Sequence, residues 1–151
     1  MSITISKPGL PSESLYNLIG GEKGLFSLVE SFNNIIETQQ VGKLLHILHL
    51  RGHGIAHSRI ELFNFLSGFL GGPNLYLEKY GHANLRKMHE HVEVTTQAKE
   101  DWIACMAMAL EEVGLEPNIK LRLLTHFSKV ASNLVNSGHG QLTATVPVGR
   151  Q

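Results

Sequence analysis

The sequence predicts an all-α fold with four substantial helices and several short helical pieces. In four separate segments, apolar residues recur at the helical spacing i, i+3, i+4 and i+7. No proline lies between Pro11 and Pro73, so long helices are permitted in that part of the chain. Outside residues 141–148, no segment alternates between polar and apolar residues as a half-buried strand would.

Size and composition exclude several classes of protein. The chain has 151 residues, of which 42% are hydrophobic and 17% charged, which suits one globular domain rather than a disordered chain. Thirteen Lys and Arg balance thirteen Asp and Glu, which argues against a nucleic-acid partner. The longest apolar run, 102–110, is too short for a membrane span, and no secretory signal begins the chain. We therefore expect a cytoplasmic protein with no membrane partner, and its single cysteine, Cys105, excludes an internal disulfide.

The N-terminal half predicts one short and two long helices. Ser14 can cap a helix at 15–19, which a pair of glycines then stops. The next helix spans 22–38, where the apolar stripe is regular. Residues 44–57 are less regular, because two glycines weaken a long helix there. The stripe returns over 58–70 and ends at a Gly-Gly-Pro sequence.

The C-terminal half predicts two further long helices. Over residues 75–93 the helical pattern of apolar residues is short and interrupted, and it predicts only a short helix at 85–90. Thr95 or Thr96 can cap a helix that continues to about residue 113. The last helix starts at a proline and spans about 117–136.

These elements divide the chain into three expected parts. Residues 1–14 form an N-terminal arm, and residues 15–136 form the helical domain. Residues 137–151 have no helical period and form a flexible tail.

Histidine is unusually frequent, with nine residues, and it is a common metal ligand. His46, His49, His53 and His57 are spaced 3, 4 and 4 residues apart, which aligns them on one helical face. One interpretation is a histidine-rich helical protein that binds zinc or copper, although zinc needs three or four converging ligands. The alternatives are a solvated histidine-rich loop and a helical adaptor with no cofactor.

Three motifs together resemble one family. They are Ser67-Gly68-Phe69-Leu70-Gly71-Gly72-Pro73, then Tyr80-Gly81-His82 followed by Leu85-Arg86 and His89, then Asp101-Trp102 followed by Cys105-Met106. In this order and spacing, over residues 15–136, they resemble the group II truncated haemoglobins. The resemblance implies a globin-like, two-over-two sandwich of helices that encloses one haem. It pairs 22–38 with 58–70, and 96–113 with 117–136.

The resemblance also implies a set of haem contacts. His89 falls on the family's proximal position, so we expect it to bind the iron of haem b (iron protoporphyrin IX). Its other ring nitrogen then needs an acceptor such as a backbone carbonyl. Either Arg86 or Lys87 is expected at a haem propionate. The expected lining of the haem is Leu62, Phe65, Leu66, Met106 and Phe127, with His49 at the haem edge.

On the distal side, Trp102 matches the family's tryptophan, whose indole N–H could stabilise bound dioxygen. Ser58 is expected on the same face. The family's Phe-Tyr pair is Phe32-Asn33 in this chain, so an amide replaces the tyrosine hydroxyl, and Met88 replaces the arginine before the proximal histidine. Because this tyrosine is missing, we hypothesise that His53 or His57 becomes a sixth iron ligand.

The implied function is binding of dioxygen or another diatomic ligand, NO or CO, at the haem iron. The role would be oxygen binding or transport, sensing, or detoxification of NO or peroxide. An enzymatic role as an NO dioxygenase or a peroxidase would require an external reductase, since the chain shows no flavin or nucleotide motif. A monomer or a homodimer is expected.

Overall fold

A computed structural model describes residues 14–51, 55–89 and 93–136, and all structural statements below concern these residues. These residues form helices joined by turns and short loops, with no β-strand among them, which confirms the predicted all-α class. In chain order the helices are α1 (Leu15–Leu18), α2 (Gly21–Thr38), the 3₁₀ helix η1 (Gln40–Gly42), α3 (Lys43–Arg51), α4 (Ile55–Phe69), α5 (Leu75–Tyr80), α6 (Leu85–Met88), α7 (Thr96–Glu112) and α8 (Pro117–Leu134).

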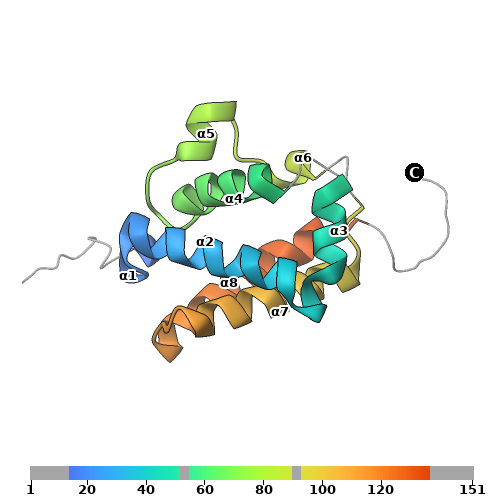
Figure 1. The fold of residues 1–151 in the computed structure, drawn as a ribbon. Coiled ribbons are helices and arrows are strands. Elements are labelled where there is room, and N and C mark those ends of the chain that lie inside the picture. Colours follow the sequence, from blue (N-terminus) through green and yellow to red (C-terminus); the bar gives the residue numbers. More distant parts are fainter. Residues whose placement is uncertain (1–13, 52–54, 90–92, 137–151) are drawn as a thin grey trace, which may run out of the picture.

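The four long helices form two pairs (Figure 1). Helix α2 packs against α4, and α7 packs against α8. The pairs are joined because α2 also packs along α7. Helix α3 closes one end of the arrangement through contacts with α2, α4 and α7, and α5 lies on the outer side of α4.

The hydrophobic core lies where α2 crosses α7. The apolar stripe of α2 is almost fully buried, as the i, i+3, i+4 spacing predicts. This stripe packs against the small and flexible side chains of α7, and α8 contributes Leu123 and Phe127 to the same core. The main core residues are Leu25, Leu28, Val29, Phe32, Ile36, Cys105, Met106, Ala109, Leu110, Leu123 and Phe127.

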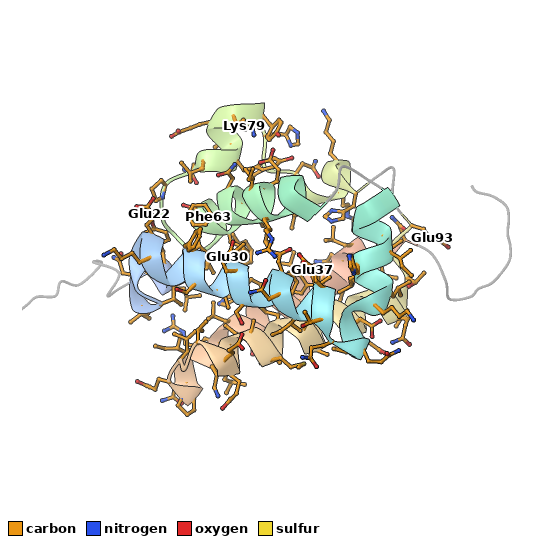
Figure 2. The ribbon with its side chains drawn as sticks, viewed as in Figure 1. Glu22, Glu30, Glu37, Phe63, Lys79 and Glu93 are labelled. Carbon is orange, nitrogen blue, oxygen red and sulfur yellow. The ribbon has the colours of Figure 1, made fainter. Side chains whose placement is uncertain are left out.

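Polar contacts fix the ends of several helices where the sequence predicts them. The Ser14 hydroxyl accepts from Asn17 N at 3.1 Å, and the Thr95 hydroxyl accepts from Ala98 N at 3.0 Å. Gly71 ends α4 with a φ of 99°, a conformation that favours glycine. Arg59 of α4 bridges to α2, where its guanidinium donates to Glu30 at 2.7 Å and to Glu37 at 2.8 Å. Figure 2 labels these two glutamates on α2.

The structure differs from the sequence prediction mainly between residues 39 and 58. The segment expected to be irregular contains the nine-residue helix α3, preceded by η1. Gly42 allows this, because a Cβ there would lie 2.5 Å from the Ile36 Cα. Helix α4 begins at Ile55, three residues earlier than expected.

No helix in the described segments is long and apolar enough to cross a membrane. The three-part division of the chain stays a prediction, since the expected arm (apart from Ser14) and the tail lie outside the described residues.

Candidate functional site

A cavity of about 570 Å³ lies between the two helix pairs, within the range of roughly 300–1,000 Å³ typical of ligand and cofactor pockets. Its walls come from α2 to α8. They are mostly apolar, with single polar groups at separate points. The lining residues are Phe32, Asn33, Leu45, Leu48, Ser58, Glu61, Leu62, Phe65, Leu66, Phe69, Tyr76, Tyr80, Leu85, His89, Glu93, Val94, Ala98, Lys99, Trp102, Phe127, Val130, Ala131 and Leu134.

His89 is the imidazole on this cavity wall, directly after the four-residue helix α6. Its ring Nδ1 lies 2.8 Å from the Leu85 carbonyl oxygen. Because a carbonyl can only accept, Nδ1 carries the proton, and in the neutral imidazole Nε2 keeps its lone pair. This hydrogen bond fixes the tautomer that a metal-binding histidine requires.

Local contacts hold α6 and therefore His89 in place. The Asn84 side chain caps α6 by accepting from Lys87 N at 3.1 Å, and Asn84 N in turn donates to His82 Nδ1 at 3.1 Å. His82 thus stabilises the turn before His89 rather than lining the cavity.

The chain that follows His89 is tied to the end of α8. Val94 N donates to the Asn136 side-chain oxygen at 2.8 Å, and Asn136 N donates to the Val94 carbonyl at 2.8 Å. Since Val94 lines the cavity, this reciprocal pair fixes the wall next to the histidine.

Trp102 and Asn33 lie on the α7 and α2 walls of the same cavity. The Trp102 ring packs against Phe32 and Phe127, with centroid distances of 5.1 Å and 5.4 Å. Asn33 is only 1% exposed, and its Nδ2 donates to the Val29 carbonyl at 2.9 Å. One of its two amide hydrogens is therefore used within α2.

A polar cluster lies where α4 and α5 meet. The Glu61 carboxylate accepts from Lys79 Nζ and Asn64 Nδ2, each at 3.0 Å, and from the Tyr80 hydroxyl. Burial opposes ionisation of Glu61, but these hydrogen bonds outweigh it, so its pKa lies below the ordinary value. The hydrogen bond to Glu61, with some burial, raises the pKa of Tyr80. The proton of this pair therefore resides on the tyrosine. Figure 2 shows Lys79 on α5, outside α4.

The cavity brings together eight residues that the sequence singled out: Asn33, Ser58, Leu62, Phe65, Leu66, His89, Trp102 and Phe127. Met106 instead lies fully buried in the core, outside this lining, and Arg86 and Lys87 are exposed on α6. Their roles stay predictions. The side chains of His49 and His57, and all of His53, lie outside the described residues.

The zinc or copper alternative gains no support from the described residues. Among them, no group of three or more His, Cys, Asp or Glu side chains could hold a metal ion.

Sequence reasoning missed several lining residues that carry a recognisable signal. Val130, Ala131 and Leu134 continue the apolar stripe of Phe127 along α8, and Ala98 precedes Trp102 by one helical turn. Tyr76 and Tyr80 on α5 belong to a segment too short to show a period, so only the structure reveals them.

The residues present fit a haem. The described part of the cavity offers an extended apolar wall and the indole of Trp102. It also offers the imidazole of His89, whose Nε2 lone pair is available to bind a metal because Nδ1 carries the proton. Lys99 also lines it and can balance one of the two haem carboxylates. Within the described part of the chain, one imidazole on mostly apolar walls suits a porphyrin better than a bare metal ion.

Comparison with known proteins agrees with this assignment. The family model for bacterial-like globins matches residues 14–136. The chain is 39% identical over 72 residues to the group 2 truncated haemoglobin YjbI of Bacillus subtilis. That alignment covers 48% of this chain and 54% of the relative, so the chain matches about half the length of this curated relative.

Solved structures extend the likeness to most of the described chain. The cold-adapted truncated haemoglobin of the Antarctic marine bacterium Pseudoalteromonas haloplanktis TAC125 aligns with a TM-score of 0.78 and 31% identity, covering 83% of this chain and 100% of that one. The truncated oxygen-avid haemoglobin from Bacillus subtilis aligns with a TM-score of 0.73 and 31% identity, covering 82% and 100%. These alignments confirm the predicted two-over-two globin fold. The chain therefore belongs to the bacterial-like globin family, and a group 2 truncated haemoglobin is among the relatives that it matches.

Proposed function

We propose that this protein binds a diatomic gas, with dioxygen as the main ligand, at a haem b whose iron is held by His89 Nε2. The observation that carries the proposal is the hydrogen bond from His89 Nδ1 to the Leu85 carbonyl, on the wall of a cavity of cofactor size. Support for dioxygen comes from the structurally similar Bacillus subtilis protein, which is described as oxygen-avid.

A haem bound here supplies an iron with one coordination position open to a gas. The protein contributes the rest of the site. Leu62, Phe65 and Phe127 line the cavity and would shield a porphyrin from water, and Trp102 would offer an indole N–H to the partial negative charge of a polar ligand. Lys99, with Arg86 or Lys87 outside the cavity lining, would balance the charge of the propionates.

The direct test is haem titration of the full chain. We expect the wild-type protein to bind one haem per chain, with a sharp absorption band in the blue and a ferrous spectrum that changes on addition of CO. His89→Gly should lose the histidine-ligated spectrum and regain it when free imidazole is added. His126→Ala, which changes an exposed histidine on α8, is the matched control and should bind haem like the wild type. A colourless wild-type protein would overturn the proposal.

A sixth iron ligand from His53 or His57 is a separate part of the proposal. It predicts a six-coordinate component in the ferrous spectrum without added gas, which weakens in the His53→Ala or the His57→Ala variant. If the ferrous spectrum is purely five-coordinate and neither substitution changes it, no distal histidine binds the iron.

A further inference from the structure

Two of the three tyrosines in the chain lie next to each other on α5, and both line the cavity. The ring centroids of Tyr76 and Tyr80 are 4.5 Å apart. Tyr80 is also 41% exposed to solvent. The pair therefore forms a short connection of oxidisable side chains from the cavity to the surface.

The Tyr80 hydroxyl has a proton acceptor in place, because it donates to the Glu61 carboxylate. Lys79 at 3.0 Å and Asn64 at 3.0 Å keep that carboxylate oriented and ionised. A tyrosine that gives up one electron at neutral pH must also release its phenolic proton. A carboxylate within hydrogen-bond reach is the group that can accept and return it.

Ring contacts also connect this pair to Trp102 on α7. Tyr76 meets Phe65 at 6.3 Å, Phe65 meets Phe69 at 5.6 Å, and Phe69 meets Phe127 at 5.8 Å. Phe127 in turn meets Trp102, the only tryptophan in the chain, at 5.4 Å. The oxidisable residues of the described chain near the cavity thus belong to one continuous set of rings, and Tyr80 is its solvent-exposed member.

We propose that Tyr80, with Tyr76 as its neighbour towards the cavity, is a redox-active site through which a small phenol or ascorbate in solution reduces a haem oxidised by hydrogen peroxide. This inference rests on the proposed function, since it needs the haem at His89. It also explains how the protein could remove peroxide with a small-molecule donor in place of a reductase.

The electrons and protons balance over two identical steps. In each step the O–H bond of Tyr80 breaks, its electron passes to the oxidised haem, and its proton passes to Glu61. The donor then returns one electron to the tyrosyl radical, and Glu61 returns the proton. Two steps, with two protons from the oxidised donor or the solvent, reduce one hydrogen peroxide to two waters.

The test compares three single substitutions in the haem-loaded full chain. After hydrogen peroxide is added to the ferric protein, rapid freezing and electron paramagnetic resonance should show a tyrosyl radical. Spin trapping followed by peptide mass spectrometry should place it on Tyr80. Tyr80→Phe should lose this radical and slow ascorbate oxidation, and Tyr76→Phe should reduce the radical yield. Tyr16→Phe, on the separate helix α1, is the control and should behave like the wild type.

The role of Glu61 has a readout that does not depend on the haem. When the haem-free protein is oxidised by a photogenerated ruthenium(III) tris-bipyridine complex, Tyr80 should be modified faster than Tyr16. Glu61→Gln should remove this preference, because the carboxylate that takes the proton is gone. A purely structural cluster would leave the preference unchanged.

The possible failures are distinguishable. If the protein binds haem through His89 but its radical forms elsewhere, or persists unchanged in Tyr80→Phe, this inference is wrong and the proposed function stands. If the protein does not bind haem, both are wrong.

Discussion

Asn33 and Trp102 both line the cavity, and each carries an N–H group that could donate to a ligand. The Asn33 amide is anchored by its hydrogen bond to the Val29 carbonyl one turn earlier in α2. The Trp102 indole is fixed in orientation by two aromatic neighbours. We therefore assign the larger share of ligand stabilisation to Trp102.

Replacing Trp102 with phenylalanine tests this assignment. The loss of one hydrogen bond worth about 1 kcal/mol should raise the dissociation rate of dioxygen about five-fold. CO, a weaker hydrogen-bond acceptor, should dissociate at nearly the same rate, and Asn33→Leu should change the dioxygen rate less than Trp102→Phe. Stopped-flow ligand replacement measures both gases. Equal acceleration of dioxygen and CO would indicate a steric effect and contradict the assignment.

Cys105 gives a pH-dependent prediction at the same scale. The thiol is fully buried in α7, and desolvation, with a smaller contribution from the charge of Asp101, raises its pKa from 9.0 to about 11. Below pH 9 the thiol is neutral in both the folded and the unfolded chain. As the pH rises from 9 through 11, only the unfolded chain can ionise freely, so the fold loses about 2 kcal/mol of stability. Denaturant unfolding at pH 8 and pH 11 should show a smaller loss in Cys105→Ala than in the wild type. Equal losses would mean that the thiol does not contribute.

At the scale of the elements, the segment between α6 and α7 is held by contact with the residues that follow α8. This segment includes Val94, which lines the cavity. In this sequence, Glu90-His91-Val92-Glu93 follows His89. The reciprocal hydrogen bonds between Val94 and Asn136 hold the chain just beyond this stretch. We infer that Asn136 fixes the proximal wall of the cavity.

Asn136→Ala should therefore speed haem loss several-fold, because the Val94 amide loses a partner worth about 1 kcal/mol. Transfer of haem to an excess of a haem-free acceptor globin measures this rate, and amide exchange at Val94 in the haem-free protein provides an independent readout. Asn133→Ala, an exposed position one turn earlier, should leave both unchanged. If the two variants behave alike, the hydrogen bonds between Val94 and Asn136 have no role in retaining haem.

The accuracy of the sequence prediction depended on how each element is stabilised. Helices α2, α7 and α8 could be predicted to within about two residues because each buries a periodic apolar stripe. Helix α3 was expected to be irregular, because the start of this helix depends on a tertiary contact, the close approach of Gly42 to Ile36, that a local sequence pattern does not show. Likewise Tyr76 and Tyr80 reach the cavity through the docking of α5 on α4, which no local pattern encodes.

For the whole molecule, two helix pairs enclose a cavity that no single element defines. The resemblance of three motifs to one family singled out His89, Trp102 and several apolar neighbours, and these residues line the cavity. The motifs could not separate Met106, which faces the core, from Phe127, which faces the cavity, since both belong to apolar stripes. The packing of α7 between α2 and α8 decides that difference.

The central claim is that one imidazole, His89, connects the protein to a haem iron. Resonance Raman spectroscopy of the ferrous, haem-loaded protein tests it most directly through the iron–histidine stretching band. We expect a band that shifts when the histidines carry nitrogen-15, disappears in His89→Gly and returns when imidazole is added to that variant. A band that persists unchanged in His89→Gly would show that another residue holds the iron.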